Sequence, residues 1–184
     1  MQFDFDIRKT IAAVAFLLSR ERGELDMFFA LKMLYLADKR ALIGWGKTIT
    51  GDKLVSMPKG PVLSKVYDLF KGTAPREFQR EWDAVFSERV NHSIHLLQNV
   101  DIELLSEREM EILESARKEI HSVAPWEISD WLHKICPEWE DPEGSSSPIE
   151  PETILRNAGK TEQEIQILDS SNEAFRYAKA IING

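Results

Sequence analysis

Two aspartates in the first third of the 184-residue chain could together do acid–base chemistry. Asp38 follows an apolar run, and Asp52 lies in a Gly-Asp turn signal. Paired carboxylates act as general acid and general base in many hydrolases. Aspartates near a helix end or in a turn more often accept hydrogen bonds from nearby backbone N–H groups. We therefore expect structural roles for both and no catalytic residues.

Histidine and cysteine provide the other candidate chemistry, in the pairs His92 with His95 and His133 with Cys136. Neither pair has the spacing of a zinc finger or knuckle, and Cys136 has no candidate base beside it in the sequence. A phosphate-binding glycine loop, a GxSxG elbow and an HExxH helix are also missing from the sequence. We predict no metal, no cofactor and no enzymatic activity, and we expect His133 to form a hydrogen bond within the fold.

The tripeptide Lys59-Gly60-Pro61 is suited to binding rather than to catalysis. Glycine permits a tight entry and proline fits the first position of a helix, so a helix is predicted from Pro61. The architectural interpretation is that both residues only shape this corner and that Lys59 is solvated. The functional interpretation is that the exposed helix N-terminus and Lys59 form a positive concavity for a partner carboxylate. Both interpretations stay open.

Tryptophan is enriched at the energetic centres of protein interfaces, and the chain has five. Trp45 and Trp139 lie beside turn or linker residues and are predicted to be exposed. Trp82, Trp126 and Trp131 are predicted to fill the core. The predicted partner-binding residues are Trp45, Asp52, Lys59, Gly60, Pro61, Tyr67 and Trp139.

Helical spacing of apolar residues and capping signals define the elements that must position these residues. Asp6 and Asp26 are predicted to cap the first two helices, and Ser106 with Glu109 forms a capping box. A second capping box, Thr161 with Glu164, opens a final helix that is expected to break near 170–172. The predicted helices cover residues 7–22, 27–43, 61–71, 106–122 and 126–135, and the segment after 161.

Strands are expected in two places. β-branched and apolar residues around the Gly51-Asp52 turn predict a strand at 53–57, and one or two more are predicted within 73–100. Pairing of these segments would form a small antiparallel sheet. The prediction is a predominantly helical α+β fold with six to seven helices and a hairpin between the third helix and the Ser106 helix. The proline-rich, acidic run 137–152 is predicted to be a loop or linker without regular structure.

Length and composition favour one domain in the cytoplasm. The single cysteine, Cys136, excludes an intramolecular disulfide, and the N-terminal residues lack a signal-peptide pattern. The longest apolar stretch, Ile11–Leu18, is far below the roughly 20 residues that cross a bilayer, so no membrane span is expected.

Charge is unevenly divided along the chain. Residues 1–100 hold 15 Lys and Arg against 12 Asp and Glu, a net charge of +3, whereas residues 101–184 hold 8 against 19, a net charge of −11. The acidic half disfavours nucleic acid and suits a basic protein partner, or it provides solvated helix faces.

Four segments in order carry a family resemblance: LKMLYLADKRAL, ITGDKLVSMPKGPVLSKVYDLF, LSEREMEIL and SDWLHKICPEW. Their order and separations resemble the Panacea domain, also called the SocA-like antitoxin domain, of bacterial and phage toxin–antitoxin systems. The resemblance covers roughly residues 7–140. It implies a Panacea domain at 1–140. The tail beyond Pro142 departs from the family pattern, and we expect residues 141–184 to form an acidic linker and a helical extension packed on the same domain.

The resemblance also implies a function. The expected protein is an antitoxin that neutralises a cognate toxin, encoded in the same operon, by direct protein–protein binding. One alternative is a proteolytic adaptor that delivers the toxin to an ATP-dependent protease, as the family's name-giving member does. Another is a DNA-binding transcriptional autoregulator, although no predicted helix carries a dense basic stripe, so nucleic acid is not an expected partner.

Overall fold

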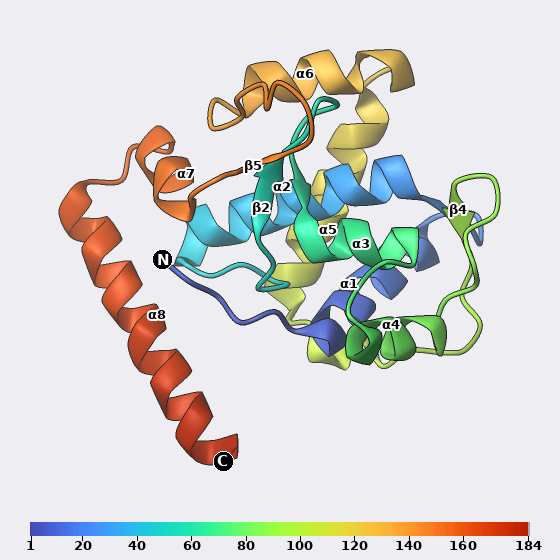
Figure 1. The fold of residues 1–184 in the computed structure, drawn as a ribbon, viewed down its shortest axis with the longest axis horizontal. Coiled ribbons are helices and arrows are strands. Elements are labelled where there is room, and N and C mark those ends of the chain that lie inside the picture. Colours follow the sequence, from blue (N-terminus) through green and yellow to red (C-terminus); the bar gives the residue numbers. More distant parts are fainter. Residues whose placement is uncertain (184) are drawn as a thin grey trace.

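The computed structural model describes residues 1–183, except for the side chains of residues 179, 182 and 183. These residues form eight α-helices and two small antiparallel sheets (Figure 1). The predicted predominantly helical α+β class is confirmed, with one helix more than the predicted six to seven. The helices are α1 Ile7–Arg20, α2 Met27–Trp45, α3 Ser64–Lys71, α4 Arg76–Asp83, α5 Glu107–Ser122, α6 Ile128–Ile135, α7 Pro151–Asn157 and α8 Glu162–Asn183.

Helix α2 runs through the core because its sequence is apolar on every side. Between Ala30 and Leu42, only Lys39 and Arg40 are partly exposed. Such a helix is stable only when other elements cover it all round. Helices α1, α3, α5 and α7 all contact α2, which makes it the scaffold on which the remaining elements are placed.

The predicted helix caps are present. The Asp6 carboxylate accepts a hydrogen bond from the Lys9 N–H, and Asp26 accepts from two N–H groups at the start of α2. Ser106 and Glu109 form the predicted reciprocal capping box at α5. These interactions satisfy N–H groups that have no partner inside a helix, which is why the helix starts were readable from local sequence.

A three-stranded sheet with the order β3-β2-β5 contains the predicted strand at 53–57. Strand β2, Leu54–Ser56, pairs with β3, Val62–Leu63, and with β5, Ser147–Pro148. The prediction that the strand at 53–57 pairs with strands within 73–100 is wrong. A tight turn at 57–60 folds the chain back on itself, so the nearest partner of β2 is the segment that follows at once.

The third helix also begins later than predicted. Val62 and Leu63 lie opposite Val55 and Leu54 in the sheet, so α3 starts at Ser64 rather than at Pro61. Pro61, which has no N–H to donate, takes the position just before the strand, where no ladder bond is required.

The segment 73–100 holds a helix that the sequence analysis missed. Helix α4 follows Pro75 and buries only Trp82, so it lacks the long apolar stripe of a predictable helix. A hairpin does follow, with an antiparallel bridge between Phe86 and Leu96. Its strand β4, Ser93–Ile94, pairs with β1, Leu25–Asp26, and not with β2.

The acidic run 137–152 is not wholly irregular, because it contains β5, and Pro151 opens α7. Helix α8 has its predicted capping box at Thr161 and Glu164, and it is continuous through the residues where a break was expected. It lies at one side of the molecule (Figure 1). The Asn172 amide donates to the Gly46 carbonyl at 2.8 Å and anchors α8 near the end of α2. No helix in the described residues is long and apolar enough to cross a membrane.

Candidate partner-binding groove

The turn between β2 and β3 forms one wall of the candidate site. The Gly60 N–H donates to the Met57 carbonyl at 2.9 Å, with Pro58 and an exposed Lys59 at the tip. Proline in the second position and glycine in the fourth are the preferences of a type I turn. Gly60 has φ +92°, which only glycine adopts without strain. A Cβ there would lie 3.4 Å from the Lys32 ammonium nitrogen, so the missing side chain leaves the space beside that ammonium open.

Lys32 reaches the same turn from α2, and its side chain is only 2% exposed. Its Nζ donates to the Pro61 carbonyl at 3.0 Å and lies 5.6 Å from the centre of the Phe28 ring. Among the described residues, no carboxylate pairs with this ammonium. Burial, helped by the positive charge of Lys59, lowers the pKa of Lys32 to about 7.

An apolar groove of about 570 Å³ opens beside these two lysines. We call it the turn groove, and define it by its lining residues. Its apolar surface comes mainly from the start of α2 and from the 57–60 turn, and Tyr67 of α3 also lines it. The described lining residues are Asp26, Met27, Phe28, Leu31, Lys32, Met57, Pro58, Lys59, Gly60, Val62, Tyr67 and His92.

Helix α6 supports the turn from behind. The Ser129 hydroxyl donates to the Lys59 carbonyl at 3.3 Å, and Leu132 lies 3.6 Å from where a Gly60 Cβ would stand. The Trp139 indole donates to the Met57 carbonyl at 2.9 Å. The two hydrogen bonds hold the Lys59 and Met57 carbonyls, and Leu132 lies beside Gly60, so α6 and Trp139 brace this wall of the turn groove.

A buried polar cluster fastens the chain after α6 to α2. The Tyr35 hydroxyl donates to the Glu138 carboxylate at 2.6 Å, and the Lys39 ammonium donates to the same group at 3.0 Å. Glu138 is therefore a paired buried charge, as buried carboxylates must be. The cluster holds Trp139 in place beside the turn.

Five of the seven predicted site residues lie at the turn groove or directly behind it. Lys59, Gly60 and Tyr67 line the turn groove together. Pro61 is buried behind it and supplies the carbonyl that Lys32 contacts, while Trp139 braces the turn.

Two predicted residues lie apart. Trp45 sits at the end of α2, half-buried, with the Arg108 guanidinium 4.4 Å from its ring centre. The buried Asp52 carboxylate accepts hydrogen bonds from the N–H groups of Lys53, Lys65 and Val66, and so caps α3 from outside the helix. Neither residue is placed to share a ligand with the turn groove.

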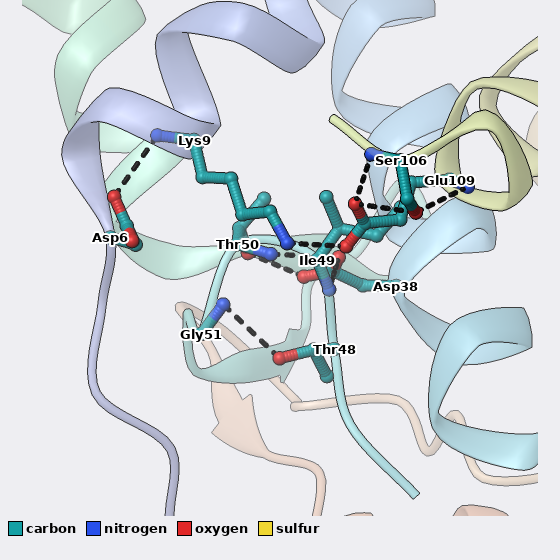
Figure 2. A network of polar contacts seen from close by, with 9 residues as sticks. All are labelled: Asp6, Lys9, Asp38, Thr48, Ile49, Thr50, Gly51, Ser106 and Glu109. Atoms are coloured by element: carbon teal, nitrogen blue, oxygen red, sulfur yellow. Dashed lines mark hydrogen bonds and ion pairs between the residues drawn. The ribbon is translucent and has the colours of Figure 1, made fainter. Parts of the chain in front are cut away.

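Asp38, the other candidate carboxylate, is also engaged with the backbone. It accepts hydrogen bonds from the Ile49 N–H at 2.8 Å, the Thr50 N–H at 3.1 Å and the Thr50 hydroxyl (Figure 2). Burial raises the pKa of Asp38 to about 7, and the Thr50 hydroxyl and the two backbone donors oppose that shift. Both aspartates therefore anchor loops to helices, as the structural interpretation of the sequence predicted.

The prediction that His133 forms a hydrogen bond within the fold is wrong. Its Nε2 is buried without a partner in the described part of the chain, and the ring instead stacks on Trp139 with centroids 3.5 Å apart. The Cys136 thiol is buried, and burial raises its pKa to about 12, so it stays neutral. Residues 1–183, as described, bring together no group of three metal-binding side chains.

The tryptophan predictions are partly wrong. Trp82 is buried as expected, but Trp126 is 81% exposed although it was predicted to fill the core. Trp139, predicted to be exposed, is half-buried because its indole serves the 57–60 turn. A position next to a turn in the sequence does not predict that a side chain is exposed, because an element distant in the sequence can cover the turn.

Sequence analysis missed Lys32 and His92 as groove residues. A signal for Lys32 was present, since it is the only charged residue between Met27 and Ala37 in a helix that is otherwise apolar there. Such a charge is costly to bury and therefore marks a special environment. His92 had no comparable signal, because its position depends on the backbone bond from the Met27 N–H to its carbonyl.

The central apolar helix and the small sheets define a predominantly helical α+β fold with the turn groove on its surface. A family model described as the antitoxin SocA-like, Panacea domain matches residues 31–140, which is more than half of the chain. The protein therefore belongs to the SocA-like Panacea antitoxin family. The match includes Lys32, the 57–60 turn and Trp139. No curated protein and no solved structure matches the chain.

Proposed function

We propose that this protein is an antitoxin that neutralises a cognate toxin by binding it directly, and that the toxin docks in the turn groove. Family membership implies a toxin partner. The observation that carries the location is the juxtaposition of an apolar hollow with Lys32, a buried ammonium that pairs with no carboxylate in the described chain.

The groove has the physical properties of a protein-docking site. Apolar side chains such as Met27, Phe28 and Leu31 favour burial of partner apolar surface, which is the main attractive term in protein association. The bracing of the turn by Ser129 and Trp139 supports a preformed site. A preformed site loses little conformational entropy when a partner binds.

In this proposal the protein neutralises its toxin by binding to it and does not catalyse a reaction. The carboxylates of Asp38 and Asp52 are engaged with backbone donors, which supports a structural role for both. We place the complex in the cytoplasm and expect the toxin gene in the same operon.

Co-expression with the product of the adjacent gene tests this function. Growth should stop with that product alone and recover when the antitoxin is present, and the two proteins should co-purify. Unchanged toxicity together with no complex would contradict the proposal.

Toxin lifetime separates occlusion from proteolytic delivery. An adaptor needs a free tether, but the 137–152 segment is attached at Trp139 to the Met57 carbonyl and at the Ile149 N–H to the Leu54 carbonyl. This favours occlusion. We expect the toxin to persist in the cell when the antitoxin is present; accelerated degradation would instead favour the adaptor alternative.

A further inference from the structure

We propose that Lys32 selects a toxin segment that inserts a glutamate side chain, flanked by apolar residues, into the turn groove. This inference rests on the proposed function and adds the chemistry of the partner. It assigns Lys32 as the positioning charge of the site, a role that the sequence analysis did not foresee.

The ammonium of Lys32 has unused binding capacity. An ammonium carries three N–H donors, and the structure shows one acceptor, the Pro61 carbonyl at 3.0 Å. The Phe28 ring, 5.6 Å away, contributes an attractive but weaker contact. A carboxylate would provide the charge-assisted hydrogen bonds that a buried ammonium otherwise lacks.

Charge in the groove favours an anionic partner. Lys32 and Lys59 both line it, and Asp26 is the carboxylate among the described lining residues. The Asp26 Oδ1 already accepts the N–H groups of Phe28 and Phe29 at the start of α2. The partner's carboxylate therefore meets two cations and one carboxylate that is committed to a helix cap.

The depth of Lys32 distinguishes a glutamate from a chain end. Because Lys32 is only 2% exposed, the incoming carboxylate must enter a groove lined by apolar side chains such as Phe28 and Leu31. The methylene groups of a glutamate suit this path. A C-terminal carboxylate would bring its own backbone N–H and C=O into the hollow, where they would be costly without partners.

Gly60 keeps the approach open. A Cβ at this position would stand 3.4 Å from the Lys32 Nζ, next to the place that the incoming oxygen must take. The glycine therefore serves both the left-handed backbone and access to the ammonium.

A double-mutant cycle tests the inference with the full antitoxin and the purified product of the adjacent gene. The antitoxin variants are Lys32→Met and Lys118→Met. Methionine keeps an unbranched side chain but removes the ammonium, and Lys118, on the exposed face of α5, is the matched control. The toxin variants replace each glutamate or aspartate by its amide, and one further variant carries a C-terminal extension. Dissociation constants are measured by calorimetry.

We expect Lys32→Met to weaken binding at least tenfold and Lys118→Met to change it less than twofold. One Glu→Gln toxin variant should bind the wild-type antitoxin more weakly by a similar factor. The same toxin variant should bind the Lys32→Met antitoxin about as well as the unmodified toxin does. Equal binding by Lys32→Met, or coupling to an aspartate or to the toxin's C-terminus, would overturn the inference. If the wild-type antitoxin binds no toxin at all, the proposed function itself fails.

Discussion

Lys32 and Pro61 are joined by a hydrogen bond of 3.0 Å from the ammonium to the backbone carbonyl. This bond connects the central helix α2 to the residue that follows the 57–60 turn. A neutral carbonyl satisfies one donor but does not balance the charge, so the protonated form of Lys32 is costly at the base of an apolar groove and its pKa falls to about 7. Such groups are costly to stability and are commonly retained for function.

Stability of the wild-type protein should depend on pH through Lys32. Its pKa is about 7 in the folded protein and 10.5 in the unfolded chain. Between these values the unfolded chain binds more protons, so the free energy of unfolding rises with pH. We expect the difference between the wild type and Lys32→Met to change by up to about 1.4 kcal/mol per pH unit. Urea unfolding at pH 7, 8 and 9 measures it.

The neighbouring groups Cys136, His133 and Lys59 do not obscure the titration of Lys32 between pH 7 and pH 9. The Cys136 thiol is neutral because its pKa is raised to about 12, and burial lowers the pKa of His133 from its ordinary value of 6.5. Lys59 contributes a nearby positive charge. Unfolding curves of the two proteins that stay parallel from pH 7 to 9 would contradict the assigned environment of Lys32.

Gly60→Ala should separate stability from binding when compared with Gly159→Ala. Both glycines have positive φ, +92° and +86°, so each substitution should destabilise the protein by about 1–2 kcal/mol. Gly159 has no atom within 4 Å of its would-be Cβ, whereas Gly60 faces Lys32. We expect only Gly60→Ala to weaken toxin binding, as measured by calorimetry after thermal unfolding confirms comparable stability. Equal affinity of both variants would count against the proposed approach path.

Asp52→Ala should lower stability because three N–H donors lose their acceptor inside the protein. We expect a loss of about 2–4 kcal/mol. Asp101→Ala is the control, since Asp101 is exposed and accepts only one N–H bond, from Glu103, and should cost less than about 1 kcal/mol. Chemical denaturation measures both. An unchanged midpoint for Asp52→Ala would contradict its role as the cap of α3.

Tyr35 and Glu138 should be energetically coupled. Their 2.6 Å hydrogen bond is buried and has a charged acceptor, so the coupling between Tyr35→Phe and Glu138→Gln should be about 1–3 kcal/mol. Denaturant unfolding of the two single variants and the double variant gives this value. Strict additivity of the two changes would show that the cluster does not fasten the segment after α6.

Local interactions made several parts of the fold predictable. The caps at Asp6, Asp26 and Ser106 act within four residues of themselves, so their sequence signals are complete. Strand pairing, in contrast, is not determined by residues that are close in the sequence. Strand β2 takes its second partner from Ser147–Pro148, about half the chain away, and no local pattern encodes that choice.

The site shows the same limit. Lys59, Gly60 and Tyr67 were predicted from the corner and its helix, and they do lie together. Lys32 could not be joined to them, because its position depends on how α2 crosses behind the turn. The exposure of Trp126 was misjudged for a similar reason, since it depends on which elements leave the start of α6 uncovered.

Photo-crosslinking of the antitoxin to the product of the adjacent gene, from two positions, tests whether the toxin docks in the turn groove. Tyr67→p-benzoylphenylalanine places the crosslinker in the turn groove, and Tyr177→p-benzoylphenylalanine places it on the exposed side of α8. We expect a crosslinked complex from position 67 and none from position 177. Crosslinking from position 177 alone, with a complex that still forms, would contradict the turn groove as the docking site.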